Sequence, residues 1–276
     1  MFFPPLRKAT EDPPKPSAKT EKIKMEKPII FKNKRNKQLM GILHLPKGKR
    51  KFPLVIICHG FGGTKTNRKF VRLARALEKK RIASFRFDFE GCGDSGGNFE
   101  SITIKRQVSD LGTVMNWVLK KKNINKNKIA FLGHSLGTVI ATLYVVQNNF
   151  PAKALIFWAS AFNQEKLIPT WQTKKDLRKW KKQGYLIRKE DKIGINYFKE
   201  NERKDYSPIL SKIEAPILII HGKKDDVVPL KFSKRLAKDY ENIKLLIYPK
   251  TDHDFEDYYI QKKLIKETMR WLAKYL

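Results

Sequence analysis

Short apolar segments alternate with amphipathic ones from Pro53 to the end of the chain, and this alternation constrains the fold most strongly. The apolar segments have the length and the two-sided character of strands that are covered on both faces. Strand–helix–strand order is typical of a mostly parallel sheet, so the fold class is α/β with helices on both faces. The predicted strands are 53–59, 82–89, 128–133, 153–159, 216–222 and 243–249, and the predicted helices are 67–80, 102–121, 135–147, 230–240 and 258–275.

Two regions depart from this alternation of strands and helices. Residues 1–26 are rich in proline and charge, which predicts a disordered tail, and Met25 is a candidate for the natural start. Residues 27–276 are predicted to form one domain that begins with a strand pair around the turn 33–36. The long interval at about 161–212 predicts an inserted cap, whose aromatic residues form either a substrate-binding wall or the cap's own core.

Basic residues dominate the composition, with 59 Lys and Arg against 27 Asp and Glu, a formal net charge of +32. The excess is spread nearly evenly along the sequence, as expected for a solvated lysine-rich surface. This pattern does not favour specific nucleic-acid binding. A basic protein that binds polyanions, either nucleic acid or anionic lipid, is the alternative from a different functional class.

Cysteine content and hydropathy bear on the compartment. The two cysteines, Cys58 and Cys92, form no disulfide framework and match no metal-ligand spacing, so we expect a reducing, cytoplasmic setting and no metal or cofactor. No run reaches the ~18 to 20 apolar residues of a transmembrane segment, and the N-terminal MFFPPL is too short for a signal-peptide core.

The segment GHSLG, residues 133–137, places one serine between two glycines at the junction of a predicted strand and a predicted helix. A G-x-S-x-G turn of this kind holds its serine in a strained conformation and presents the hydroxyl outward. Glycines on either side remove the Cβ atoms that would block so sharp a bend. Ser135 is therefore a candidate nucleophile.

Three further motifs follow predicted strands, where open α/β sheets place their sites. CHGFGG, residues 58–63, can offer the backbone N–H of Phe61 to an oxyanion, with the N–H of Leu136 as second donor and His59 bracing the loop. HGKKDDVVP, residues 221–229, supplies Asp225 or Asp226 as an acid. KTDHDFED, residues 250–257, supplies His253 as a base, and the order Ser, Asp, His is the one this fold uses.

Together these motifs resemble the α/β-hydrolase superfamily, and particularly its cinnamoyl and feruloyl esterase-like serine hydrolases, over about residues 28–276. The resemblance implies that Asp225, rather than Asp226, completes a triad with Ser135 and His253. It also implies that Phe61 and Leu136 stand at the oxyanion positions. Two segments depart from the usual pattern, namely EGCGDS at 90–95 and GHSLGT at 133–138, and the lysine-rich cap matches no known phenol-recognising residues.

The sequence thus predicts a serine hydrolase that cleaves small-molecule carboxylic esters through an acyl-enzyme. An acyl-peptidase, a thioesterase or an acyltransferase would share both the fold and the triad chemistry, so these alternatives stay open. Oligomeric state and physiological substrate do not follow from the sequence.

Overall fold

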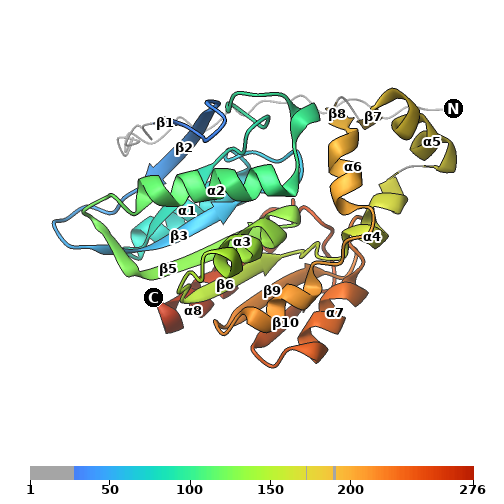
Figure 1. Ribbon diagram of the computed structural model, residues 1–276. Coiled ribbons are helices and arrows are strands. Elements are labelled where there is room, and N and C mark those ends of the chain that lie inside the picture. The colour runs from blue at the N-terminus through green and yellow to red at the C-terminus, as the bar shows by residue number, and fades with distance from the viewer. Residues whose placement is uncertain (1–27, 172, 189–190) are drawn as a thin grey trace, which may run out of the picture.

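The computed structural model describes residues 28–171, 173–188 and 191–276, so the predicted tail and Met25 lie outside the described residues. Its centre is an eight-stranded sheet of order β1-β2-β4-β3-β5-β6-β9-β10 (Figure 1). The strands of this sheet are β1 (Pro28–Lys32), β2 (Gln38–His44), β3 (Phe52–Cys58), β4 (Ala83–Phe87), β5 (Ile124–His134), β6 (Ala154–Trp158), β9 (Ile217–Gly222) and β10 (Ile243–Tyr248).

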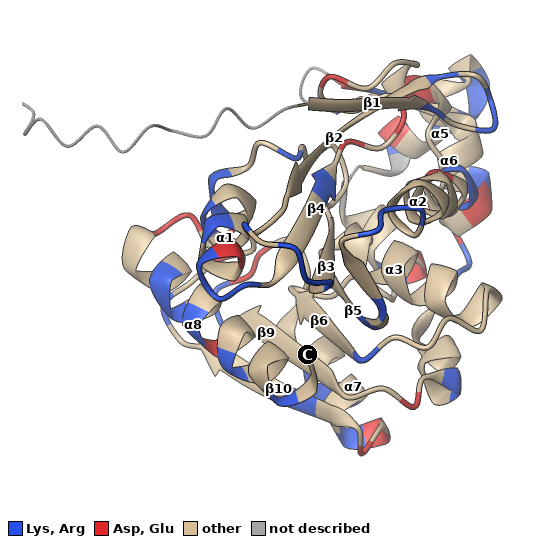
Figure 2. Ribbon diagram, turned by 90° about the vertical axis from the view of Figure 1, so that its left-hand side faces the viewer, with Lys and Arg blue, Asp and Glu red and all other residues tan. Residues whose placement is uncertain are grey.

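The six strands from β4 to β10 run parallel, and β2 pairs antiparallel with both β1 and β4. The predicted strand pair around 33–36 is therefore confirmed. Because the parallel strands point the same way, the sheet has an amino edge, where they begin, and a carboxyl edge, where they end. The amino edge lies at the left in Figure 1, and Figure 2 views the molecule from that side.

Alternate residues of each strand face two separate apolar layers. Val55 and Ile57 of β3 pack in a cluster with residues of α1 and α8, whereas Leu54 and Ile56 pack with residues of α2 and α3. The sheet is therefore covered on both faces, as Figure 2 shows, which explains why its strands read as continuous apolar runs. The helices are α1 (Arg68–Lys79), α2 (Ile104–Val118), α3 (Leu136–Gln147), α7 (Leu230–Asp239) and α8 (Tyr258–Tyr275).

Helix starts follow from side-chain caps. The side chain of Asn67 accepts a hydrogen bond from the N–H of Lys69, so α1 begins one residue after its predicted start. Thr103 caps α2 in the same way, and this helix ends at Val118, earlier than the predicted 121. Asp257 caps α8, whose predicted bounds match the observed ones.

The chain between β6 and β9 forms an insertion that stands beyond the carboxyl edge, at the right in Figure 1. Within it, Trp180 and Phe198 are buried with ring centroids 5.0 Å apart, so these two aromatics belong to the insertion's own core. The insertion contains α4 (Gln164–Leu167), η2 (Ile168–Trp171), α5 (Lys174–Gln183), β7 (Tyr185–Arg188), β8 (Asp191–Gly194), α6 (Ile195–Asn201) and η3 (Ser207–Lys212).

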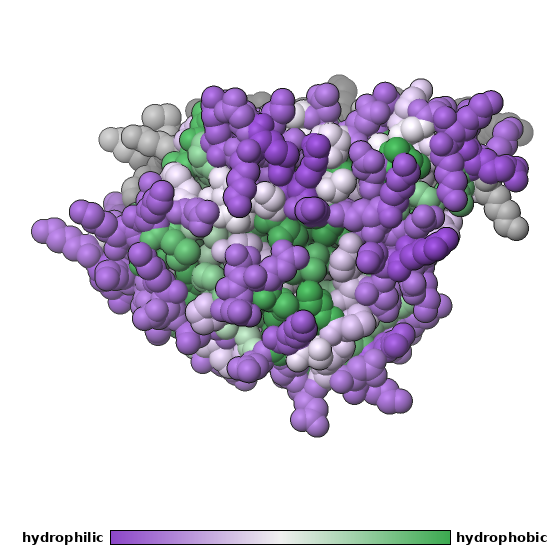
Figure 3. Space-filling view, in the orientation of Figure 1, coloured by the Kyte–Doolittle hydropathy of each residue, from purple (hydrophilic) through white to green (hydrophobic). Residues whose placement is uncertain are grey.

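Hydrophilic side chains cover most of the face shown in Figure 3, with apolar surface visible in patches between them. Within the described ranges, no helix combines the length and the apolar character needed to cross a bilayer.

Candidate active site

Ser135 lies at the sharp turn between the end of β5 and the start of α3, with φ 53° and ψ −119°. This conformation is strained for a residue with a side chain. The turn packs tightly against β3, since a Cβ on Gly137 would lie only 2.3 Å from the carbonyl oxygen of Cys58. The N–H of Ser135 also donates to the carbonyl of Trp158 at 2.8 Å, and this hydrogen bond helps to hold the turn. The backbone of β3 therefore packs directly against the turn, as the glycine spacing predicts.

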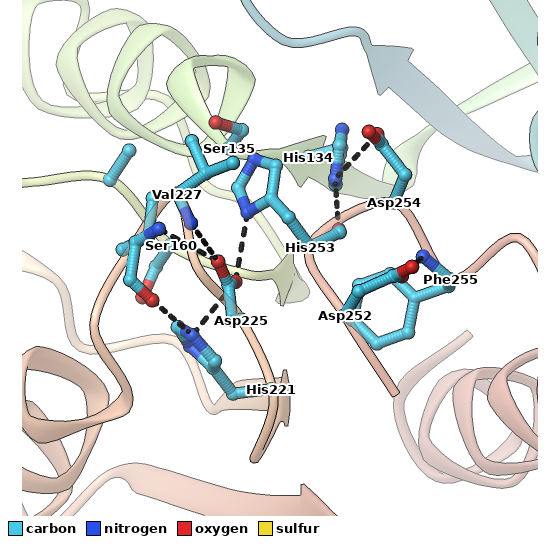
Figure 4. A network of polar contacts seen from close by, with 12 residues as sticks. His134, Ser135, Ser160, His221, Asp225, Val227, Asp252, His253, Asp254 and Phe255 are labelled. Atoms are coloured by element: carbon cyan, nitrogen blue, oxygen red, sulfur yellow. Dashed lines mark hydrogen bonds and ion pairs between the residues drawn. The ribbon is translucent and has the colours of Figure 1, made fainter. Parts of the chain in front are cut away.

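Asp225 follows β9 and His253 follows β10, and the structure brings them together. His253 Nδ1 lies 2.8 Å from Asp225 Oδ2 (Figure 4). The backbone N–H groups of Val227 and Val228 donate to Asp225 Oδ1 at 3.0 and 2.7 Å, and His221 Nε2 lies 3.0 Å from Oδ2. Four groups thus fix the orientation of this carboxylate.

The environment keeps Asp225 ionised. Burial alone would raise the pKa of this carboxyl group, but hydrogen bonds from His221 and His253 outweigh burial and hold its pKa well below the usual range. A carboxylate in this state fixes the neighbouring imidazole with a proton on Nδ1, which leaves Nε2 as an acceptor.

The second ring nitrogen of His253 is turned toward Ser135 (Figure 4). Among the described residues no hydrogen bond joins these two side chains. Such contacts are often long before substrate binds, so the geometry agrees with a base waiting beside a nucleophile. Ser135 and His253 are 9% and 7% exposed, so both side chains are largely buried.

The loop after β3 closes the opposite side of the serine. A Cβ on Gly60 would lie 3.0 Å from the Cβ of Ser135, so the backbone leading into Phe61 runs beside the serine. His59 accepts the N–H of Phe89 at Nε2, 3.1 Å away, and its Nδ1 lies 2.8 Å from the carbonyl of Gly60. His59 therefore braces this loop, the role that the sequence favours, and burial lowers its pKa.

Leu136 is the first residue of α3, and the backbone N–H groups in the first turn of a helix have no partner within the helix. The partial positive charge of a helix N-terminus favours a developing negative charge at this place. The two predicted oxyanion donors, Phe61 and Leu136, are thus in segments that flank Ser135.

Sequence reasoning missed a buried cluster behind His253. Lys69 of α1 donates from Nζ to the carbonyl of Asp254 at 2.9 Å and to its carboxylate at 3.3 Å, and Nζ lies 3.5 Å from His134 Nε2. The same His134 nitrogen lies 3.0 Å from the carbonyl of His253. Burial lowers the pKa of Lys69, although the charge of Asp254 acts in the opposite direction. Burial also lowers the pKa of His134, and the nearby positive charge of Lys69 lowers it further.

This cluster ties α1 and the nucleophile turn to the loop that carries His253. Lys69 is only 1% exposed, whereas charged residues are seldom fully buried unless they are paired. The available sequence signal was a lysine on the apolar stripe of a predicted helix, next to Phe70 and Leu73.

The segment after β4 supplies a second buried ion pair. Lys65, in the loop after β3, contacts the carboxylates of Asp88 and Asp94, and Asp88 also accepts the N–H groups of Lys65 and Asp94 at 2.6 and 2.9 Å. The departure from the family pattern at Cys92 leaves a buried free thiol, whose pKa burial raises to about 12. Cys92 is therefore no nucleophile at neutral pH.

The insertion reaches the site through an aromatic contact. Tyr197 of α6 packs edge-on against Phe61, with ring centroids 4.9 Å apart, and Phe99 also packs edge-on against Phe61 at 5.1 Å. Tyr197 is fully buried and donates its hydroxyl to Gln164 at 3.0 Å. Within the described part of the chain, no group of three or more His, Cys, Asp or Glu is arranged to hold a metal ion.

Comparison with known proteins shows the family and the fold of this chain. Residues 49–206, more than half of the chain, match the family described as serine aminopeptidase S33. An uncharacterized 31.7 kDa protein of Escherichia coli is 36% identical over 93 residues, 34% of this chain and 32% of that protein. The lysophosphatidylserine lipase ABHD12 of Danio rerio is 29% identical over 192 residues, 67% of this chain and 46% of the lipase.

The first match spans about a third of the Escherichia coli protein, and the second spans less than half of the lipase. Among solved structures, Est1E from Butyrivibrio proteoclasticus with bound ferulic acid superimposes with a TM-score of 0.79 at 24% identity, covering 90% of this chain and 98% of that one. That likeness confirms the predicted α/β-hydrolase fold. Because the family match covers more than half of the chain, the chain belongs to the serine aminopeptidase S33 family of α/β hydrolases.

Proposed function

We propose that this α/β hydrolase cleaves carboxylic esters with Ser135 as nucleophile, His253 as general base and acid, and Asp225 as the group that orients His253. The backbone N–H groups of Phe61 and Leu136 are the proposed oxyanion donors. The observation that carries the proposal is the strained turn at Ser135, with the hydrogen-bonded Asp225–His253 pair beside it.

The reaction proceeds through an acyl-enzyme. Ser135 Oγ attacks the ester carbonyl while His253 takes its proton, and the oxyanion of the tetrahedral intermediate accepts hydrogen bonds from the two N–H donors. Collapse breaks the bond to the alcohol oxygen, which leaves with the proton from His253. Water then attacks the acyl-enzyme, His253 relays its proton to Ser135, and the carboxylic acid leaves. The chemistry draws on the chain and water alone.

The proposed domain is residues 27–276, with the insertion at about 161–212 serving as a cap over the acyl or aromatic part of the substrate. Its support is the contact of Tyr197 with Phe61, which connects the insertion to a proposed oxyanion donor. Because Trp180 and Phe198 are committed to the insertion's own core, the binding wall is made by other residues.

The similar proteins favour esters as substrates. The zebrafish relative is a lipase, and the solved neighbour Est1E holds ferulic acid, an aromatic acid. The family description favours a second candidate, the removal of an N-terminal residue from a peptide, which uses the same acyl-enzyme steps with an amine as leaving group.

The test compares purified wild type with Ser135→Ala on p-nitrophenyl acetate, p-nitrophenyl butyrate, a cinnamate ester and an aminoacyl p-nitroanilide. We expect ester turnover in the wild type and a loss of at least about 10⁴-fold in Ser135→Ala, because the oxyanion donors alone give little rate. A wild type that cleaves only the anilide would establish the peptidase instead. Equal turnover by both proteins would overturn the assignment of Ser135.

A further inference from the structure

Charge that is evenly spread along the sequence is unevenly placed in the fold. The segments that lead into or begin β3, β4, β5 and β6 carry twelve basic side chains and no carboxylate, and Figure 2 views this amino edge. The segments that follow β3, β4, β9 and β10 at the carboxyl edge carry ten carboxylates and four lysines, whereas the insertion after β6 is itself lysine-rich. The twelve basic residues are Lys47, Lys49, Arg50, Lys51, Lys80, Arg81, Lys120, Lys121, Lys122, Lys126, Lys128 and Lys153.

Helix dipoles explain part of this polarity. Helices α1, α2 and α3 end at the amino edge, and cations near helix C-termini are stabilising, which accounts for Lys80 and Lys120. It does not account for the loop 45–51 between two strands, nor for Lys126 within β5. Carboxylates near this edge are Glu78 in the last turn of α1 and, farther along, Glu214, Asp239 and Glu241 before β9 and β10.

Five of these lysines line one groove with a volume of about 530 Å³. Within the described part of the chain none of the five forms an ion pair with a carboxylate, and four of them are exposed. Like charges that line one concave surface create a positive potential that favours an anion there, and the Lys121 ammonium also lies 3.9 Å from the centroid of the Trp117 ring. The groove is lined by Lys51, Lys120, Lys121, Lys122, Ile124, Asn125, Lys126 and Asn127.

The walls of this lysine groove are held in place by the fold. The N–H of Phe52 donates to the carbonyl of Asn123 at 2.8 Å, which joins the segment carrying Lys51 to the one carrying Lys122. Ile124 is buried and pairs with Phe52 across β3 and β5. The side chain of Asn125 accepts the N–H of Asn127 at 3.1 Å, which fixes the turn at the far side. The groove is thus formed before any ligand binds.

We propose that the lysine groove is a binding site for a phosphate-rich, multiply charged ligand of the polyphosphate type, separate from the proposed active site. Lysine binds phosphate as a point charge, and five such groups around one concave space favour a compact chain of adjacent phosphates. The asparagine amides supply additional N–H donors to phosphate oxygens.

The shape of the groove favours this ligand over two other polyanions. A bilayer surface is flat and cannot bring several headgroups into a concavity of this size. Single-stranded nucleic acid is held by stacking on aromatic side chains as well as by charge, and no aromatic residue is among the lining residues. Recognition therefore rests on the phosphates themselves.

The test is calorimetric titration of the full chain with sodium tripolyphosphate. We expect one saturable site whose affinity falls on the order of tenfold between about 50 and 200 mM salt, because binding releases counterions. The triple variant Lys51→Gln, Lys122→Gln, Lys126→Gln is expected to lose about tenfold or more in affinity. The same three positions changed to arginine should retain binding, which separates charge from folding.

A matched control removes three exposed lysines from α7, namely Lys231→Gln, Lys234→Gln and Lys238→Gln, and leaves the same net charge. This variant should bind tripolyphosphate within about twofold of wild type. An equal loss in both triple variants would overturn the site in favour of net charge. Absence of saturable binding, or binding to phosphatidylserine vesicles but not to tripolyphosphate, would also overturn it. Ester turnover by the groove variant stays unchanged, so the outcome is independent of the proposed activity.

Discussion

The two edges of the sheet hold their charges in different ways. At the carboxyl edge, Asp225, Lys65 and Lys69 are buried, and each has fixed partners within hydrogen-bond distance. At the amino edge, Lys51 and Lys122 are exposed and unpaired among the described residues. A charge of the first kind is part of the fold, whereas a charge of the second kind is available to a ligand.

The difference also shows why a count of net charge misleads. A formal charge of +32 describes the whole chain, yet in the segments after β4, β9 and β10, taken together, carboxylates outnumber lysines. At the opposite edge, the segments that lead into or begin β3, β4, β5 and β6 are basic and carry no carboxylate. Substrate charge and groove ligand are therefore separate questions, and variants at the two edges address them independently.

The largest expected effect after Ser135→Ala is that of Asp225→Asn. The amide cannot hold His253 in the tautomer that accepts a proton at Nε2, so kcat should fall by about 10³- to 10⁴-fold. Asp226→Asn is the matched control, because Asp226 is exposed and adjacent in sequence, and it should stay within about twofold of wild type. Steady-state kinetics on the same ester provide the measurement. A large loss in Asp226→Asn with little in Asp225→Asn would reverse the assignment.

The same substitution at two lysines compares the edges directly. Lys69→Met leaves the carbonyl of Asp254 without its donor and frees the His253 loop, so we expect a loss of about 1 to 3 kcal/mol in unfolding free energy. We also expect kcat to fall by about tenfold with KM unchanged, because a misplaced base affects the chemical step. Lys122→Met should change stability by less than about 0.5 kcal/mol.

Urea denaturation and ester kinetics on the two proteins decide the outcome. Lys69→Arg serves as a further variant, since it keeps the charge but cannot fit the same buried space. If Lys69→Met is as stable and active as Lys122→Met, the cluster of Lys69, His134 and Asp254 has no role in positioning His253.

Much of the fold was predictable from local signals. Period and turn residues located the six parallel strands, and amphipathic periodicity located the starts of α1 and α8 within a residue. The strand β5 begins at Ile124, earlier than the predicted 128, because Ile124 pairs with Phe52 of β3 ahead of an irregularity that takes up the polar residues 125–128. That extension depends on a neighbouring strand, which hydrophobic periodicity along one segment does not report.

The site residues were found from motifs at strand ends, since parallel strands bring those ends to one edge. The positions of Lys69 and His134 behind His253 were not found, because they arise from contacts between residues far apart in the chain. The charge polarity was missed for a related reason. Windows along the sequence mix residues from both edges, so opposite charges average out within each window.

The smallest expected effect is a change in how stability depends on pH. His134 and His59 both have pKa values lowered by burial, so the unfolded chain, with a histidine pKa of about 6.5, binds more protons than the folded chain below that pH. Their contribution is therefore fully present above about pH 6.5 and declines as pH falls, by about 1.4 kcal/mol per pH unit for each histidine.

Replacement His134→Gln removes one of these two groups while keeping an N–H donor for the carbonyl of His253. Urea denaturation at about pH 7.5, 6.5 and 5.5 should show a slope for this variant that is shallower than that of wild type by about 1.4 kcal/mol per pH unit in the acidic range. Changing exposed Lys122 to Gln at the amino edge should leave the slope unaltered, because this substitution removes no histidine. Parallel curves for wild type and His134→Gln would mean that His134 binds its proton equally in both states. The buried cluster would then lack the low-dielectric character that sets the carboxyl edge apart from the solvated lysines opposite.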